Sequence, residues 1–134
     1  MELPDSAAIR VGKLGQFAFP AGWYVYVGSA RGPGGLAARV SRHCKASKVL
    51  RWHVDYLRAY AKPVAVWYAI GDQKHECDWA RLLVAISDGP GSPQGFGASD
   101  CRCSTHLAHF MTRPSIATFA PILDEDVWIN AVEV

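Results

Sequence analysis

The sequence predicts a single mixed α/β (α+β) domain. Short runs of β-branched and aromatic residues, such as Trp23–Gly28, have the composition of strands. They alternate with longer segments in which apolar residues recur at helical spacing, as Leu36, Val40 and Cys44 do. Half of the 134 residues are apolar, which is enough for one hydrophobic core at this length.

Composition excludes several other classes of protein. No apolar run approaches the roughly 20 residues that a membrane-spanning helix needs. The opening residues Met1–Asp5 lack the basic and apolar regions of a signal peptide, so a cytoplasmic location is the default expectation. The four cysteines are too few and too unevenly spaced for the disulfide framework of a secreted protein.

Strands are expected first along the chain. Glycines break residues 8–19 into two short strand segments, Ile9–Lys13 and Phe17–Phe19. A turn containing Pro and Gly then leads into Trp23–Gly28, which is predicted as a central strand because it is aromatic and β-branched.

Two helices are expected next. A turn rich in Gly and Pro precedes a helix from about Leu36 to Lys45, and the apolar stripe of this helix should face the core. The second helix spans Trp52–Ala61, with Val54 and Leu57 on its apolar face, and Pro63 ends it.

The second half of the chain begins with a strand over the apolar run Val64–Ile70 and continues with a helix over His75–Ser87. Four side chains of that helix should point inward: Cys77, Ala80, Leu83 and Val84. Residues 89–97 are too rich in Gly and Pro for regular structure. In the tail, the apolar segments Ile116–Leu123 and Val127–Val134 would add an edge strand or a partner surface.

Positive charge is concentrated in one part of the chain. Between Arg31 and Lys62 there are eight Lys or Arg residues and a single acid, Asp55. Such a segment suits the binding of a polyanion, and it equally suits a solvated helical surface. The candidates for contact with a polyanion are Arg31, Arg42, Lys45 and Lys48.

Two tyrosines and an arginine could meet a phosphate group where the central strand ends. Tyr24 and Tyr26 are two residues apart on a strand, so their side chains project from the same face. Such a pair is commonly part of a core, but Gly28 lies two residues beyond Tyr26, at the strand end where a ligand would approach the backbone. Arg39 borders an apolar helical stripe where acids are scarce, so a bound anion would explain it.

Several acidic, His and Cys residues have two interpretations each. Glu76 lies in the first turn of a helix, where a carboxylate is favoured by the helix dipole, and it could also bind Mg²⁺ or Mn²⁺ together with substrate oxygens. His53 and Asp55 could orient a base or cap a helix. A zinc-like C-x-C-x-x-H spacing is present, but no second pair of ligands is spaced like a zinc finger. We therefore expect a structural loop rather than a metal site over Asp100, Cys101, Cys103 and His106, with Asp100 and His106 capping or hydrogen-bonding the backbone.

An ordered set of motifs over about residues 9–110 resembles the Uri-type branch of the GIY-YIG nuclease superfamily. Members of that branch are small stand-alone proteins or modules fused to endonuclease III-like repair glycosylases. The motifs are Val11–Gly15, Phe19–Ala30, Gly34–Arg39, Arg42–His43, Trp52–Leu57, Glu76–Cys77, Gly95–Cys103 and His106–Leu107.

The resemblance implies a small three-stranded antiparallel sheet flanked by helices, and divalent-metal-dependent hydrolysis of a DNA phosphodiester. It implies that Tyr26 belongs to the YIG element, that Arg39 steadies the scissile phosphate, and that His43 assists proton transfer. Glu76 would hold one Mg²⁺ or Mn²⁺ ion. Tyr24 or Tyr26 would act on the attacking water. DNA and a repair enzyme are the implied partners.

The resemblance also sets the expected domain limits, with a nuclease-like domain over residues 1–114 and a C-terminal extension over residues 115–134. In relatives a strand carrying Gly-x-Tyr precedes the segment at Val11, whereas residues 1–10 contain neither Gly nor Tyr. We expect either that the chain is shortened at its N-terminus or that Gly22–Tyr24 replaces this strand.

Two other functions follow from the same residues. Without the first strand, the chain would be a catalytically weak or inactive DNA-binding module that assists repair. Alternatively, its Trp-containing tail would make it a purely structural interaction domain.

Overall fold

The chain folds around a small antiparallel sheet, which a computed structural model describes for residues 1–45, 49–123 and 127–134. The strand order is β1-β4-β6, formed by Glu2–Leu3, Gly22–Tyr26 and Leu107–Phe110. The central strand β4 therefore has partners on both sides, with Trp23 opposite Glu2 on β1 and opposite Phe110 on β6. The expected mixed α/β class and the central position of this strand are confirmed.

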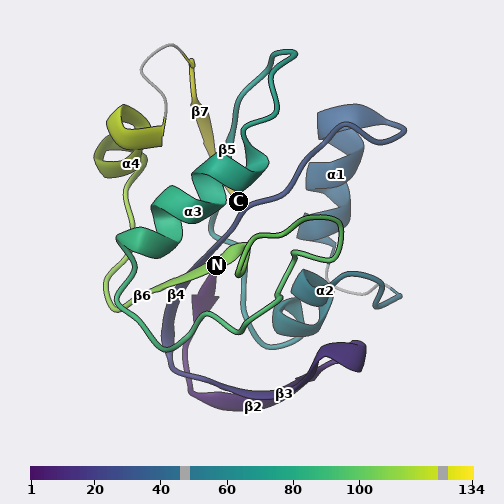
Figure 1. Ribbon diagram of the computed structural model, residues 1–134, viewed down its shortest axis with the longest axis vertical. Helices are drawn as coiled ribbons and strands as arrows, with labels where there is room; N and C mark the ends of the chain where they lie inside the picture. Colours follow the sequence, from purple (N-terminus) through teal and green to yellow (C-terminus); the bar gives the residue numbers. More distant parts are fainter. Residues whose placement is uncertain (46–48, 124–126) are drawn as a thin grey trace.

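The chain between β1 and β4 forms a β-hairpin that extends away from the central sheet (Figure 1). Its strands β2 (Ala7–Val11) and β3 (Gly15–Phe19) pair antiparallel, and a 3₁₀ turn over Gly12–Leu14 joins them. The two strand segments expected between residues 8 and 19 are thus both present. Their inward side chains Ile9, Val11 and Phe19 are buried.

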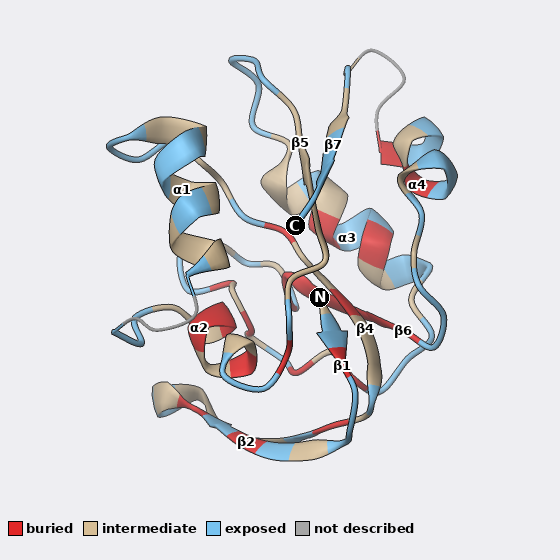
Figure 2. Cartoon of the chain, turned by 180° about the vertical axis from the view of Figure 1, so that it is seen from behind, coloured by how far each residue is buried: buried red, intermediate tan, exposed pale blue. Residues whose placement is uncertain are grey.

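Helix α1 (Gly35–Cys44) and helix α2 (His53–Arg58) lie on the same side of the molecule (Figure 2). Val54 and Leu57 on α2 are buried, as predicted. The prediction that α1 buries an apolar stripe in the core is wrong. None of its ten residues, all within the described part of the chain, is fully buried. Instead Leu36, Val40 and Cys44 line an open cleft.

The other side of the molecule holds helix α3 (Glu76–Ala85) and helix α4 (Ile116–Leu123), which contact each other. A two-stranded ribbon of β5 (Ala65–Tyr68) and β7 (Asn130–Glu133) lies beside them. The two tail segments therefore form a helix and an edge strand. Among the described residues, no helix combines the length and apolar character needed to cross a bilayer.

Two hydrophobic clusters pack against the two faces of the central sheet. Tyr24 and Tyr26 both face the cluster that contains Phe19, Leu57 and Phe96. The alternate residues of the same strand, Val25 among them, face the cluster around α3 and α4. The expectation that the two tyrosines share a face is confirmed, because successive residues of a strand point to opposite sides.

Asp55 is a buried carboxylate that organises the start of α2. Its side chain is fully buried, and its Oδ2 lies 2.6 Å from the Arg42 guanidinium. The same oxygen accepts the backbone N–H groups of Arg51 at 2.9 Å and Trp52 at 3.0 Å. Of the two roles expected for Asp55, the structure shows the cap.

Replacing Asp55 with Asn should lower the free energy of unfolding by about 3 kcal/mol, because it removes the buried carboxylate charge that pairs with the partly buried Arg42 guanidinium. Asp78→Asn is the matched control: Asp78 occupies the corresponding position of α3, but both members of its pair with Arg81 are exposed. That change should cost about 1 kcal/mol or less. Urea unfolding of both variants measures the difference, and equal losses would contradict the role given to Asp55.

Candidate functional site

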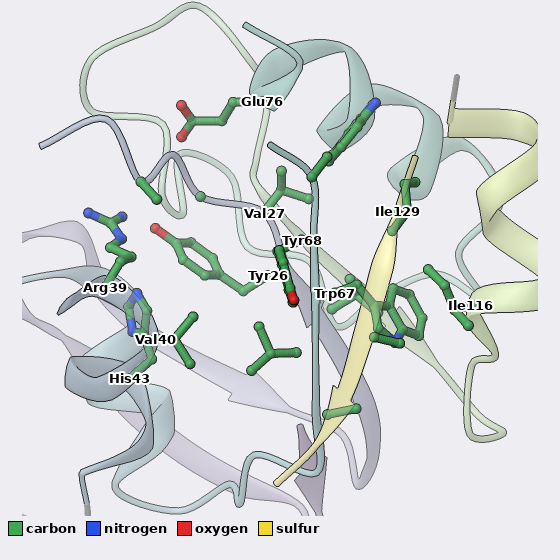
Figure 3. A pocket seen from close by; sticks show the side chains of 18 of the residues that line it. Tyr26, Val27, Arg39, Val40, His43, Trp67, Tyr68, Glu76, Ile116 and Ile129 are labelled. Carbon is green, nitrogen blue, oxygen red and sulfur yellow. The ribbon is translucent and has the colours of Figure 1, made fainter. Parts of the chain in front are cut away.

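A cleft of about 1540 Å³ separates α1 from β5 and the start of α3. The end of β4 forms its floor with Tyr26, and its two walls carry Arg39 and Glu76. Figure 3 shows the Tyr26 hydroxyl, the Arg39 guanidinium and the Glu76 carboxylate extending toward one region of the cleft. Three residues far apart in the sequence, and singled out from it, are thus brought together.

Tyr26 is the last residue of β4, and its ring is held by aromatic contacts. The rings of Phe96 and His43 meet it edge-on, with centroids at 6.3 and 5.9 Å. Burial raises the pKa of Tyr26, while the charge and hydrogen bond of Arg39 oppose that rise. Its hydroxyl is therefore neutral near pH 7 and can both donate and accept a hydrogen bond.

Gly28 leaves the space in which Tyr26 and Arg39 approach each other. A Cβ atom on Gly28 would lie 3.0 Å from Cε1 of Tyr26 and 3.2 Å from Nη2 of Arg39. Any side chain at this position would push one of these two groups away. The close approach of Tyr26 and Arg39 thus explains why a glycine stands at position 28.

Arg39 presents a guanidinium held in place from one side. Its Cζ lies 4.0 Å from the centroid of the Trp52 ring, at the distance of a cation–π contact. Its Nε is buried and has no hydrogen-bond partner within the described ranges. A guanidinium stacked in this way on the cleft wall can present its outer N–H groups to an anion.

His43 lies one helical turn after Arg39 and forms part of the same wall. Its ring packs between Tyr26 and Trp52, with a centroid distance of 5.5 Å to Trp52. The sequence-predicted neighbours Tyr26, Arg39 and His43 are therefore in mutual proximity.

Glu76 is the first residue of α3 and reaches the cleft from the opposite side. Its side chain is one third exposed, and its Oε1 lies 3.3 Å from Nδ1 of His106. His106 is buried, and the same Nδ1 lies 3.2 Å from the Val27 carbonyl oxygen. His106 thus joins the start of α3 to the end of β4.

Beside Glu76, three thiols and an imidazole form a cluster that could bind a metal ion. Cys77, Cys101, Cys103 and His106 each place one ligand atom within 4.8 Å of the others. The sequence pattern offers no fourth ligand beside Cys101, Cys103 and His106, whereas the structure places Cys77 of α3 next to these three. Cys77 is also only partly buried, not the core thiol that the helical pattern predicts. Hydrogen bonding to Cys103, followed by burial, raises the pKa of its thiol to about 12.

Tyr24 is placed away from these groups, contrary to a role on the attacking water. It is buried, and its hydroxyl donates to the Pro20 carbonyl at 2.6 Å. Burial raises its pKa far above the ordinary value for tyrosine. Tyr24 belongs to the core, which is the commoner role of such a tyrosine.

The predicted polyanion contacts have varied surroundings. Arg42 is engaged with Asp55, and Arg31 donates to the Gln73 carbonyl at 2.6 Å across the cleft mouth. Lys45 is exposed at the end of α1. Lys48 lies outside the described residues.

The remaining predicted residues hold the loop before β6 or lie outside the site. His53 accepts the Gly97 N–H at 2.9 Å through Nδ1, and burial lowers its pKa. His53 is therefore a structural partner of this loop, while Asp100 is exposed on it.

Two residues that support the site were not identified from residue type alone. Trp52 stacks against the Arg39 guanidinium, and Gly97 lies against the Tyr26 ring. Gly97 has φ +69°, and a Cβ atom there would lie 2.8 Å from Cε2 of Tyr26. The signal for Gly97 is its place in the run Gly95–Gly97, which the sequence marks only as a loop.

Comparison with protein-family models places the chain in a family. The model described as Domain of unknown function DUF123 matches residues 1–126, so the chain belongs to this family. No curated protein and no solved structure matches the chain.

Proposed function

We propose that this chain of the DUF123 family is a divalent-metal-dependent endonuclease that hydrolyses phosphodiester bonds of DNA in repair or processing. The observation that carries the proposal is the meeting of a phenol, a guanidinium and a carboxylate at one cleft. They come from β4, α1 and α3 as Tyr26, Arg39 and Glu76. The ordered motifs that resemble those of Uri-type GIY-YIG nucleases support the same reaction.

Arg39 would stabilise the transition state. Hydrolysis makes a bond between a water oxygen and phosphorus, breaks the bond to the leaving sugar oxygen, and gives that oxygen a proton. Negative charge grows on the phosphate oxygens during this exchange, and a guanidinium already fixed over Trp52 can bind them without first being reorganised.

Tyr26 would orient the attacking water. Because burial raises its pKa, the hydroxyl keeps its proton at neutral pH and offers a donor and an acceptor at once. His43 packs against the same ring and would take part in moving the proton. Together these groups give the water a fixed place beside Arg39.

The site fits one Mg²⁺ or Mn²⁺ ion held through Glu76. Both ions prefer carboxylate oxygens and commonly use one or two protein carboxylates together with substrate oxygens. Glu76 is partly exposed and directed into the cleft, so a substrate phosphate could share the ion with it. When bound, the ion supplies positive charge that offsets the charge developing on the phosphate.

The proposal is tested by incubating the purified chain with supercoiled plasmid and with branched DNA, in Mg²⁺, in Mn²⁺ and in EDTA. We expect nicked or linear products with either ion and none in EDTA. Binding that weakens as salt increases, without turnover in either ion, would replace the enzyme by the DNA-binding accessory module. A chain that neither binds nor cleaves either DNA would contradict both.

Replacing Gly28 with Ala should slow cleavage by about 10- to 100-fold, because the added methyl group displaces Tyr26 or Arg39 by a fraction of an ångström. Gly32→Ala is the matched control in the same loop, since a Cβ atom at Gly32 meets nothing within 4 Å. Initial rates and melting temperatures of both variants measure the effect. Equal rates for the two variants would contradict the close approach assigned to Gly28.

A further inference from the structure

We propose that Cys77, Cys101, Cys103 and His106 bind one Zn²⁺ ion as a closed structural site. These four residues, the Cys₃His cluster, come from two separate parts of the chain. Cys77 belongs to the first turn of α3, and the other three precede β6. The ion would therefore connect α3 to the loop that leads into the central sheet.

The spacing of the ligand atoms suits a tetrahedral ion. With Zn–S bonds of about 2.3 Å, two sulfur ligands of one zinc are about 3.8 Å apart. All four atoms of the Cys₃His cluster lie within 4.8 Å of one another, and Cys101 Sγ is 3.3 Å from Nε2 of His106. Small side-chain adjustments are enough to bring them around one ion.

The orientation of His106 is a second observation that points to a metal. Nε2 faces the thiols, while Nδ1 lies 3.2 Å from the Val27 carbonyl oxygen and 3.3 Å from Glu76. Histidines that bind metals through one nitrogen usually donate the other N–H to a carbonyl or a carboxylate, which fixes the tautomer. His106 has this arrangement, and its side chain is buried.

The donor set selects the kind of ion. Three sulfur ligands and one imidazole favour zinc among the common divalent ions, whereas Mg²⁺ prefers oxygen. Four protein ligands fill a tetrahedral zinc and leave no position for water, which is the pattern of a structural site. The Cys₃His cluster is thus distinct in chemistry from the carboxylate Glu76, although the two are adjacent in the chain.

One consequence rests on the proposed function. Glu76 directly precedes Cys77 in α3 and lies against the ring of His106. Gly97, in the loop before the Cys₃His cluster, lies against both Tyr26 and His106. Zinc at this cluster would fix the distance between Glu76 and Tyr26 across the cleft. The four ligands of the Cys₃His cluster therefore act as positioning residues.

The test is the metal content of the full chain, produced with zinc in the medium and measured by elemental analysis. We expect about one zinc per chain in the wild type and in Cys44→Ser, and less than about 0.1 in Cys103→Ser. Cys44 is the matched control because it is also a partly buried free thiol, on α1. Equal loss of zinc in the two variants, or a wild type that holds no metal, would overturn the proposal.

If Cys103→Ser fails to fold, X-ray absorption of the wild-type protein still decides. We expect three sulfur atoms at about 2.3 Å from zinc and one nitrogen at about 2.0 Å. A shell made only of oxygen and nitrogen would overturn the site.

The two proposals fail separately. Zinc at one per chain in a protein that never cleaves DNA would contradict the nuclease and leave the zinc site intact. Full cleavage by a wild-type chain that holds no zinc would contradict the zinc site alone, and full cleavage by zinc-free Cys103→Ser would contradict only the positioning role of the zinc ligands. The added Mg²⁺ or Mn²⁺ is distinguished from the resident zinc because dialysis should remove only the former.

Discussion

Replacing Arg39 with Ala is expected to lower the rate of DNA cleavage by about 1000-fold or more, which corresponds to about 4 kcal/mol of transition-state stabilisation. The guanidinium is stacked on Trp52 at 4.0 Å and lines the cleft. The substitution should lower kcat, because the contacts of Arg39 with the phosphate oxygens strengthen as negative charge develops in the transition state. Single-turnover cleavage, with the protein in excess over the DNA and above the Kd of the complex, measures this loss.

A second substitution of Arg39 separates the paired N–H donors of the guanidinium from its charge, and an arginine outside the site provides the control. Arg39→Lys keeps the charge but not the paired donors, so it should recover only part of the rate. Arg10→Ala removes an exposed arginine from β2 and should leave the rate unchanged. If Arg39→Ala has the melting temperature and the cleavage rate of the wild type, Arg39 is not part of the catalytic site.

Replacing Glu76 with Gln should reduce cleavage by about 100- to 1000-fold at a fixed Mg²⁺ concentration, because an uncharged amide is a poor ligand for this ion. The size and shape of the side chain are kept, so the contact with His106 can persist. Raising the Mn²⁺ concentration should recover part of the rate. Titration of cleavage against each ion measures the change.

Asp78→Asn is the control for Glu76, since it removes an exposed carboxylate from the same first turn of α3. It should cleave at the wild-type rate. Glu76→Gln should also keep its zinc, because Glu76 is not among the four clustered ligands. Metal dependence that is identical in Glu76→Gln and the wild type would exclude Glu76 as the ligand.

The parts of this protein that local patterns determine were predictable from its sequence. The two-residue period of β4 puts Tyr24 and Tyr26 on one face, and the structure agrees. The spacing of Val54 and Leu57 gives the buried face of α2. In each case the signal lies within a few residues and depends on the geometry of a single element.

Features that depend on tertiary packing were not predictable in the same way. Leu36 and Val40 have the spacing of a core stripe, but no element in the described part of the chain covers them fully, so they line the cleft. Strand β6 was missed because it is only four residues long and contains the buried polar residue His109. Its burial comes from pairing with β4, which no local pattern shows.

The Cys₃His cluster shows the same limit for sites. Cys101, Cys103 and His106 are close in sequence, and their spacing suggests a partial metal site. The fourth member, Cys77, is supplied by a helix and has the helical spacing of a core residue, so no motif joins it to them. Likewise, the proximity of Glu76 to Tyr26 depends on how α3 packs across β6.

The central claim is that Tyr26, Arg39 and Glu76 act on one DNA phosphate, and Tyr26→Phe tests it most directly. This change removes one oxygen atom from the cleft and keeps the ring that packs on Phe96 and His43. We predict a fall of about 100-fold in single-turnover cleavage, with an unchanged melting temperature and DNA affinity. Cleavage by the phenylalanine variant at the wild-type rate would contradict the account.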